Sequence, residues 1–203
     1  MPQGDRLERL DRFTPVERLA HRSTATLALV LLATGLVLYL PSLSLVIGRR
    51  PLLEAVHVVA GLLLPLPVLA ALATPSFRAD LGALNRFSRA DREWLRRRDR
   101  RTAGLPVGKF NAGQKLAAAA FGAGGVVLLG TGLMLLLPTQ LRLPDGLRQG
   151  ATIVHDSATL ALMALLLGHA WLAWMHPEAR EAMRTGAMDL EYAQREHADW
   201  AAH

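Results

Sequence analysis

Four stretches of this chain run for about 20 residues or more without a charged side chain. They cover residues 23–48, 55–77, 116–141 and 157–177. Each stretch is long enough to cross a bilayer as an α-helix, which satisfies its own backbone hydrogen bonds in the hydrocarbon. In a chain of 203 residues, too little amphipathic sequence remains to cover four such helices in a soluble core. The sequence therefore predicts an all-α membrane protein, built as a four-transmembrane-helix bundle.

These blocks also set the expected domain organisation. One membrane domain is predicted over residues 1–178, with a basic loop at 76–113, and residues 179–203 form a C-terminal tail. The spans are expected at about 23–47, 53–75, 114–138 and 151–176. The first block is too long for the apolar region of a signal peptide and lacks a convincing cleavage motif, so we expect it to remain as a span. Pro65 and Pro67 should kink the second span.

Lys and Arg are distributed unevenly among the segments that connect the blocks. Residues 1–22 carry five, residues 74–115 carry eleven, and the chain after Pro177 carries three. The two remaining connections hold only Arg49, Arg50, Arg142 and Arg148. Because basic residues accumulate on the cytoplasmic side, both termini and the central loop are predicted to be cytoplasmic. We expect a multi-pass protein of the bacterial cytoplasmic membrane. Its basic run at 94–101 would face anionic lipid rather than nucleic acid.

Two histidines in the fourth block, His155 and His169, lie fourteen positions apart. On an α-helix, this separation places both imidazoles within roughly 40° of one face and roughly 21 Å apart along the axis. In a hydrocarbon core about 30 Å thick, one histidine then lies near each surface. Ionisable side chains inside a membrane are costly and usually functional. The spacing suggests two cofactors, and the obvious candidates are two b-type haems that carry electrons across the bilayer.

The predicted topology sorts four histidines into two levels. The first span runs outward and the second returns, so His21 lies near the cytoplasm and His57 near the outside. The fourth span also runs inward, which places His155 outside and His169 inside. His57 therefore pairs with His155, and His21 pairs with His169. Two imidazoles per level are what a six-coordinate haem requires, and such an iron is suited to one-electron transfer. The alternative for any single histidine is an interfacial residue bonded to water or a carbonyl group.

Glycines recur inside the apolar blocks. Several of them could make room for a flat macrocycle between helices: Gly35, Gly61, Gly130, Gly132 and Gly168. Small residues also let membrane helices pack closely without any cofactor, so both interpretations stand. The glycine-rich run at 121–125 lies in an apolar helix with no preceding strand, which argues against a dinucleotide-binding loop.

The chain contains no cysteine. It therefore cannot hold a thiolate-ligated iron–sulfur cluster, attach a c-type haem covalently or use a thiol nucleophile. Among the remaining histidines, His176 is predicted at the membrane interface. His197 and His203 lie in the polar tail and are predicted to be exposed to solvent.

Several motifs together resemble one protein family. They are RFTPVERLAHR (12–22), VHVVAG (56–61), GKFNAGQK (108–115) and MRTGAMDLEYAQREHADW (183–200). With the spacing of the two fourth-span histidines, they make the chain similar, over nearly its whole length, to the cytochrome b (gamma) subunit of respiratory membrane-bound formate dehydrogenase. The Asn-Ala-Gly-Gln-Lys stretch is the most specific part of this resemblance. Four spaced histidines would also suit hydrogenase and b561-like cytochromes.

The resemblance implies a division of labour. A molybdenum- or tungsten-containing catalytic (alpha) subunit oxidises formate outside the membrane, and an iron–sulfur (beta) subunit passes the electrons on. This chain would contain no formate-oxidising site, and it would deliver electrons to a quinone, either menaquinone or ubiquinone. His57 and His155 would ligate the outer haem, and His21 and His169 the inner one.

The resemblance also implies a quinone site near the inner haem, with Asn111, Gly113 and Gln114 close to the quinone head group. Asn and Gln offer amide donors to a quinone carbonyl, and Gly allows close backbone approach. Lys115 is a candidate proton relay. The alternative for this stretch is a helix N-cap at Asn111, and the two roles are compatible.

Two other classes of function remain open. The chain could be a quinone-reducing cytochrome b subunit of a hydrogenase or of another molybdenum oxidoreductase. It could also be a cofactor-free membrane anchor or transporter whose histidines bind metal or protons.

Overall fold

The computed structural model describes residues 8–98 and 105–202. The chain divides into two compact units. Unit 1 comprises the described parts of Met1–Arg18, Ala73–Ala119 and Gly168–His203, and unit 2 comprises Leu19–Leu72 and Ala120–Leu167. Three long helices, α1 (Pro15–Tyr39), α7 (Ala112–Leu136) and α8 (Asp145–Met175), contribute residues to both units.

Four helical segments are long and apolar enough to cross a membrane: Pro15–Tyr39, Arg50–Ala71, Ala112–Leu136 and Asp145–Met175. In the most apolar window of each segment, no more than 6% of the residues are buried within the protein. Apolar side chains left uncovered over whole helices are expected where lipid, rather than a protein core, surrounds them. The predicted all-α, four-span membrane fold is confirmed.

Helix α1 begins at Pro15, well before the predicted start of the first span at residue 23. Thr14 and Glu17 form a capping box, since the Glu17 carboxylate accepts from the Thr14 amide at 2.9 Å and the Thr14 hydroxyl accepts from the Glu17 amide at 3.3 Å. The helix ends at Tyr39, and a short helix, α2 (Pro41–Ile47), follows. Charged residues outside a bilayer do not interrupt a helix, so helix ends and span ends need not coincide.

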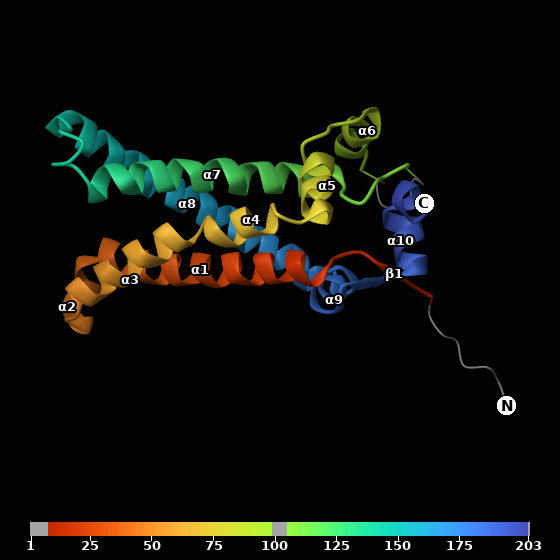
Figure 1. The fold of residues 1–203 in the computed structure, drawn as a ribbon, viewed down its shortest axis with the longest axis horizontal. Coiled ribbons are helices and arrows are strands. Elements are labelled where there is room, and N and C mark those ends of the chain that lie inside the picture. Colours follow the sequence, from red (N-terminus) through yellow and green to blue (C-terminus); the bar gives the residue numbers. More distant parts are fainter. Residues whose placement is uncertain (1–7, 99–104, 203) are drawn as a thin grey trace. The chain divides into compact units, whose positions relative to one another are not determined.

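The second apolar segment is divided into α3 (Arg50–Leu63) and α4 (Leu66–Ala71), as Figure 1 shows. The interruption lies at Leu64 and Pro65, and Pro67 occupies an early position of α4. Proline lacks the amide hydrogen that a continuing helix needs and clashes with the preceding turn. The kink predicted at these prolines is confirmed.

Unit 1 contains the short helices α5 (Pro75–Leu84), α6 (Arg89–Arg96), α9 (Pro177–Thr185), α10 (Leu190–Glu196) and α11 (Ala198–Ala201). It also contains a two-stranded ribbon that the sequence did not predict. Strand β1 (Arg9–Asp11) pairs antiparallel with β2 (Ala187–Asp189), with Leu10 opposite Met188. Beside the ribbon, a core forms from Ala182, Met188, Tyr192 and Ala193, with Phe13 and Trp200 packed against it.

A tight turn at Gly186 leads into β2. Its φ of 98° lies in the left-handed region, and a Cβ added there would come within 2.6 Å of the Phe13 carbonyl oxygen. The Gly186 carbonyl accepts hydrogen bonds from the amides of Arg12 and Phe13, at 2.7 and 2.9 Å. Only glycine fits this close approach of two backbone segments.

The C-terminal tail is therefore folded, and one prediction about it is wrong. His197 is only 2% exposed, and its Nδ1 lies 2.9 Å from the Gly108 carbonyl oxygen. The Asp199 amide also donates to the Val107 carbonyl at 3.1 Å. The prediction of solvent exposure failed because a polar composition does not reveal a tail that docks on a distant loop. His203 lies outside the described residues.

Candidate functional site

Two of the predicted site histidines meet in unit 2. His57 is carried by α3 and His155 by α8, and their ring centroids are 6.4 Å apart with an interplanar angle of 66°. Both side chains are half-buried. The outer pair that the topology predicted from sequence is thus brought together by the fold.

Each histidine of this pair touches a threonine on a different helix. The Nδ1 atom of His57 lies 2.9 Å from Oγ1 of Thr34 on α1. The Nδ1 atom of His155 lies 2.9 Å from Oγ1 of Thr131 on α7. Sequence reasoning did not find these threonines. Their signal is a repeated Thr-Gly-Leu triplet, at 34–36 and 131–133, in the first and third apolar blocks.

The glycine of each triplet faces the same imidazole. A Cβ added to Gly35 would lie 3.3 Å from Cε1 of His57, and one added to Gly132 would lie 3.4 Å from Cε1 of His155. At both positions the glycine allows a helix to approach a histidine ring of another helix, and the interpretation of these glycines as room for a flat macrocycle stays a prediction. By contrast, an added Cβ at Gly124 would come within 2.7 Å of the Leu162 side chain, which indicates close helix packing there.

The spacing of the pair fits a metal shared by two imidazoles. Two imidazole rings this close could together hold one metal-centred group between them. Within residues 8–98 and 105–202, no group of three or more His, Cys, Asp or Glu residues could hold a metal ion. A two-histidine arrangement is what a haem iron needs, because the macrocycle supplies the remaining ligands.

The other two predicted ligands lie on helices of the same set. His21 is in the second turn of α1, and His169 is near the C-terminal end of α8. Both side chains are exposed at the protein surface. Helix α8 is continuous from Asp145 to Met175, so it carries His155 and His169 at the predicted axial separation of about 21 Å. The pairing of His21 with His169 stays a prediction.

The Asn-Ala-Gly-Gln-Lys stretch opens α7, in unit 1. The Asn111 side-chain oxygen accepts a hydrogen bond from the backbone N–H of Gln114 at 3.0 Å. The Gln114 side-chain oxygen in turn accepts one from the backbone N–H of Asn111 at 3.0 Å. This reciprocal arrangement is a capping box. The N-cap interpretation of Asn111 is confirmed. The box uses only the side-chain oxygens, so the two amide NH2 groups are not needed for it.

The residues that follow Asn111 are packed against α6. A Cβ added to Gly113 would lie 3.1 Å from the Trp94 ring, so glycine allows this contact. The Lys115 ammonium donates to the Asp91 carboxylate at 2.7 Å and to the Arg86 carbonyl at 2.9 Å. Lys115 and Asp91 are 8% and 5% exposed. A lysine held this way anchors the start of α7, and this bonding favours a structural role over the predicted proton relay.

Unit 1 also contains a largely buried cluster of charged side chains, Arg12, Lys109 and Asp80, that the sequence did not predict. The Arg12 guanidinium donates to the Lys109 carbonyl at 2.6 Å and contacts the Met188 sulfur at 3.0 Å. Burial lowers the pKa of Arg12 to about 10. The Lys109 ammonium donates to both carboxylate oxygens of Asp80, at 2.6 and 2.7 Å. Burial nevertheless raises the pKa of Asp80 above its usual value.

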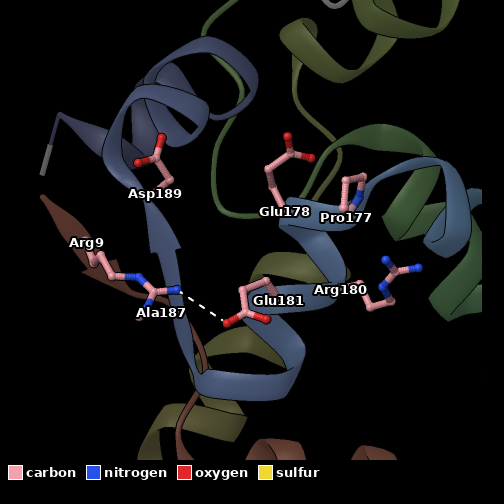
Figure 2. Close-up of a pocket in the computed structure, with 7 residues that line it drawn as sticks. All are labelled: Arg9, Pro177, Glu178, Arg180, Glu181, Ala187 and Asp189. Atoms are coloured by element: carbon pink, nitrogen blue, oxygen red, sulfur yellow. Dashed lines mark ion pairs between the residues drawn. The ribbon is translucent and has the colours of Figure 1, made fainter. Parts of the chain in front are cut away.

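A pocket of about 350 Å³ lies elsewhere in unit 1, between β2 and α9 (Figure 2). Its lining contains an ion pair of 3.6 Å between Arg9 and Glu181. The lining residues are Arg9, Pro177, Glu178, Arg180, Glu181, Ala187 and Asp189. None of the predicted ligands or quinone-site residues lines it, so this pocket does not belong to the candidate site.

Comparison with known proteins completes this picture. Residues 12–188 match the family described as prokaryotic cytochrome b561. This chain belongs to that family. No curated protein matches the chain. The family includes cytochrome b subunits of hydrogenase and of formate dehydrogenase, and its members anchor periplasmic oxidoreductase subunits.

Family membership fixes the general role of this cytochrome b561. It is a membrane dihaem electron carrier and the cytochrome b subunit of a respiratory oxidoreductase complex. Haem b is its cofactor, and histidines paired across helices fit haem ligation. The alternative of a cofactor-free anchor or transporter is not supported.

Proposed function

We propose that this cytochrome is the gamma subunit of a membrane-bound formate dehydrogenase. It would receive electrons from an iron–sulfur subunit on the periplasmic side and reduce quinone near the cytoplasmic side. The observation that carries the electron-transfer part is the His57–His155 pair, with its centroid separation of 6.4 Å. The formate part rests on the resemblance of the motifs at 12–22 and 108–115.

Four histidines would hold the two haems, His57 and His155 the outer one, and His21 and His169 the inner one. When bound, the two haems supply a one-electron path across the bilayer. Ligation would require each imidazole in its neutral form, with a free lone pair on the ligating nitrogen. The protein contributes the depth and orientation of each ring.

The quinone site would be built at the start of α7. The capping box fixes Asn111 and Gln114 through their side-chain oxygens, which leaves an amide NH2 group on each to donate to a quinone carbonyl. Gly113 would allow the head group to approach the backbone. Lys115 supports the site indirectly, because its ion pair with Asp91 holds the first turn of the helix.

The positions proposed for the two haems give the reaction a direction. Formate oxidation by the partner subunit would release protons outside, and quinone reduction would take up protons at the cytoplasmic side. Electrons crossing between these sides would build a membrane potential without a proton channel.

The haem part is tested on the purified chain in mild detergent. A reduced-minus-oxidised spectrum with a pyridine haemochrome count should give two b haems per chain. A folded but colourless protein would refute this part of the proposal.

The donor is tested on the complex purified from native membranes through a tag on this chain. Co-purification of a molybdenum- or tungsten-containing subunit with formate:quinone activity would support the proposal. A nickel-containing partner with hydrogen:quinone activity would instead assign the chain to a hydrogenase, the second candidate that the family includes.

A further inference from the structure

The two Thr-Gly pairs of unit 2 occupy equivalent positions around the central histidines. Thr34 and Gly35 lie on α1 against His57, and Thr131 and Gly132 lie on α7 against His155. The contact distances agree closely, since both Oγ1–Nδ1 distances are 2.9 Å. The same arrangement of a threonine and a glycine therefore occurs twice, once beside each histidine ring.

Each threonine hydroxyl has one proton, so its other contacts decide whether it donates to the imidazole or accepts from it. The Thr34 hydroxyl lies 2.7 Å from the Val30 carbonyl oxygen and 3.2 Å from that of Leu31. The Thr131 hydroxyl lies 2.8 Å from the Val127 carbonyl and 3.2 Å from that of Leu128. A carbonyl can only accept, so the single hydroxyl proton of each threonine points at its own helix backbone. The hydroxyl oxygen is then left as an acceptor toward the imidazole.

This arrangement selects one tautomer of each histidine. Nδ1 must carry the hydrogen that the threonine oxygen accepts, so a neutral ring has its free lone pair on Nε2. The bond also fixes the rotation of the ring. A hydrogen bond on the non-ligating nitrogen raises the basicity of the ligating one, which is a recognised way of tuning a bound metal.

We propose that Thr34 and Thr131 are positioning residues for the outer haem, each holding its histidine as the Nδ1–H tautomer with Nε2 presented to the iron. Gly35 and Gly132 lie beside the same two rings, since a Cβ added at either position would lie 3.3 or 3.4 Å from Cε1 of the histidine. This inference rests on the proposed role of His57 and His155 as haem ligands.

The test compares Thr34→Val and Thr131→Val with Thr34→Ser and Thr131→Ser in the full chain. Valine keeps the shape and removes the acceptor oxygen, whereas serine restores it. Thr26→Val is the matched control, because the Thr26 hydroxyl bonds the Arg22 carbonyl at 2.9 Å in the same i−4 pattern on the same helix. The readouts are the haem count, the midpoint potential of the outer haem and its low-spin electron paramagnetic resonance signal.

The valine variants should bind the outer haem roughly ten- to a hundred-fold more weakly, and any haem retained should have a shifted potential and resonance signal. The serine variants and Thr26→Val should match the unchanged protein, and the inner haem should report correct folding in every variant. Wild-type potential and signal in both valine variants would overturn this inference alone. Two haems retained after His57→Ala and His155→Ala would instead overturn the ligand assignment on which it rests.

Discussion

At the scale of single residues, the candidate site consists of His57, His155 and the threonines beside them. His155 has its ring within 6.4 Å of His57, measured between centroids, and both rings are held by threonine hydroxyls. The pair could be predicted from sequence because membrane topology alone places both residues at one depth. The threonines were missed, because the repeated Thr-Gly-Leu triplet points to a site only once each hydroxyl is seen beside a histidine of another helix.

His155→Ala should remove the outer haem, and His169→Ala should remove the inner one. Each haem would be held by two imidazoles, so a chain that lacks one of them should no longer retain that haem. The pyridine haemochrome count should fall from two haems per chain to one in each variant. Retention of both haems in either purified variant would contradict the assignment.

Asn111 offers a residue-scale test that separates its two roles. Asn111→Asp keeps the oxygen that caps α7 but loses the amide donor, whereas Asn111→Ala loses both. Both variants should weaken quinone reduction, by about ten-fold for one lost hydrogen bond. Only the alanine variant should also lose about 1 kcal/mol of helix stability.

The measurement for Asn111 is steady-state quinone reduction in variants whose two haem spectra are intact. The melting temperature in detergent measures how much the Asn111 cap stabilises the protein. Unchanged quinone kinetics in the aspartate variant would remove Asn111 from the quinone site and leave it only as a cap.

At the scale of elements, the structure differs from the sequence prediction in where the first helix begins. The first span was predicted from residue 23 because Arg22 directly precedes it, yet α1 begins at Pro15. Hydropathy reports the part of a helix that lies in hydrocarbon, and it does not detect a capping box beyond the bilayer. The kink near Pro65 was predictable because proline acts locally, whatever the tertiary context.

The junction of α6 and α7 depends on one buried ion pair. Asp91 accepts from Lys115 at 2.7 Å and also completes a capping box with Ser88. Lys115→Met should destabilise this junction by about 3–5 kcal/mol, because it leaves a buried carboxylate without its partner. Asp91→Asn should also destabilise the junction. Arg97→Met is the control and should have little effect on stability, because the ion pair between Arg97 and Glu93 is exposed. Melting temperatures in detergent measure all three.

The same junction should be sensitive to acid. Burial alone would raise the pKa of Asp91, but hydrogen bonds from Lys115 and Ser88 outweigh it and hold the pKa below its usual value. The folded state therefore favours the ionised carboxylate. This stabilisation is fully present above the unfolded value of about 4 and is lost as the pH falls through the lower folded pKa. Asp91→Asn should flatten the acid limb of the stability curve, and an unchanged limb would contradict this assignment.

At the scale of the whole molecule, the four membrane helices could be predicted from the sequence, but the contacts that build unit 1 could not. Four long apolar blocks predict four membrane helices regardless of how they pack. Unit 1 instead depends on pairings between distant segments, such as Arg9–Asp11 with Ala187–Asp189 and His197 with Gly108. No local periodicity indicates such contacts, so His197 in the tail was predicted to be exposed to solvent.

Deletion of residues 179–203 should affect the two units differently. Unit 1 would lose β2 and the core around Met188, so Arg12 and Lys109 would be exposed to solvent. Unit 2 ends at Leu167 and keeps His57 and His155, so the outer haem should remain. Limited proteolysis within residues 105–111 and a haem count measure the two effects. Deletion of Ala202 and His203 alone, beyond the end of α11, is the control and should change neither.

The composition of unit 1 from the start, middle and end of the chain has a consequence for biogenesis. All residues of unit 2 have been synthesised by Leu167, whereas β1 must wait for Ala187–Asp189 before it has a partner. Domains fold as their residues emerge from the ribosome, so unit 2 can begin to fold in the membrane while unit 1 is still incomplete. Unit 1 gains its C-terminal helices only once α10 and α11 have been synthesised. A chain truncated before Ala187 would keep His57 and His155 but would lack the strand that pairs with β1 and the core around Met188.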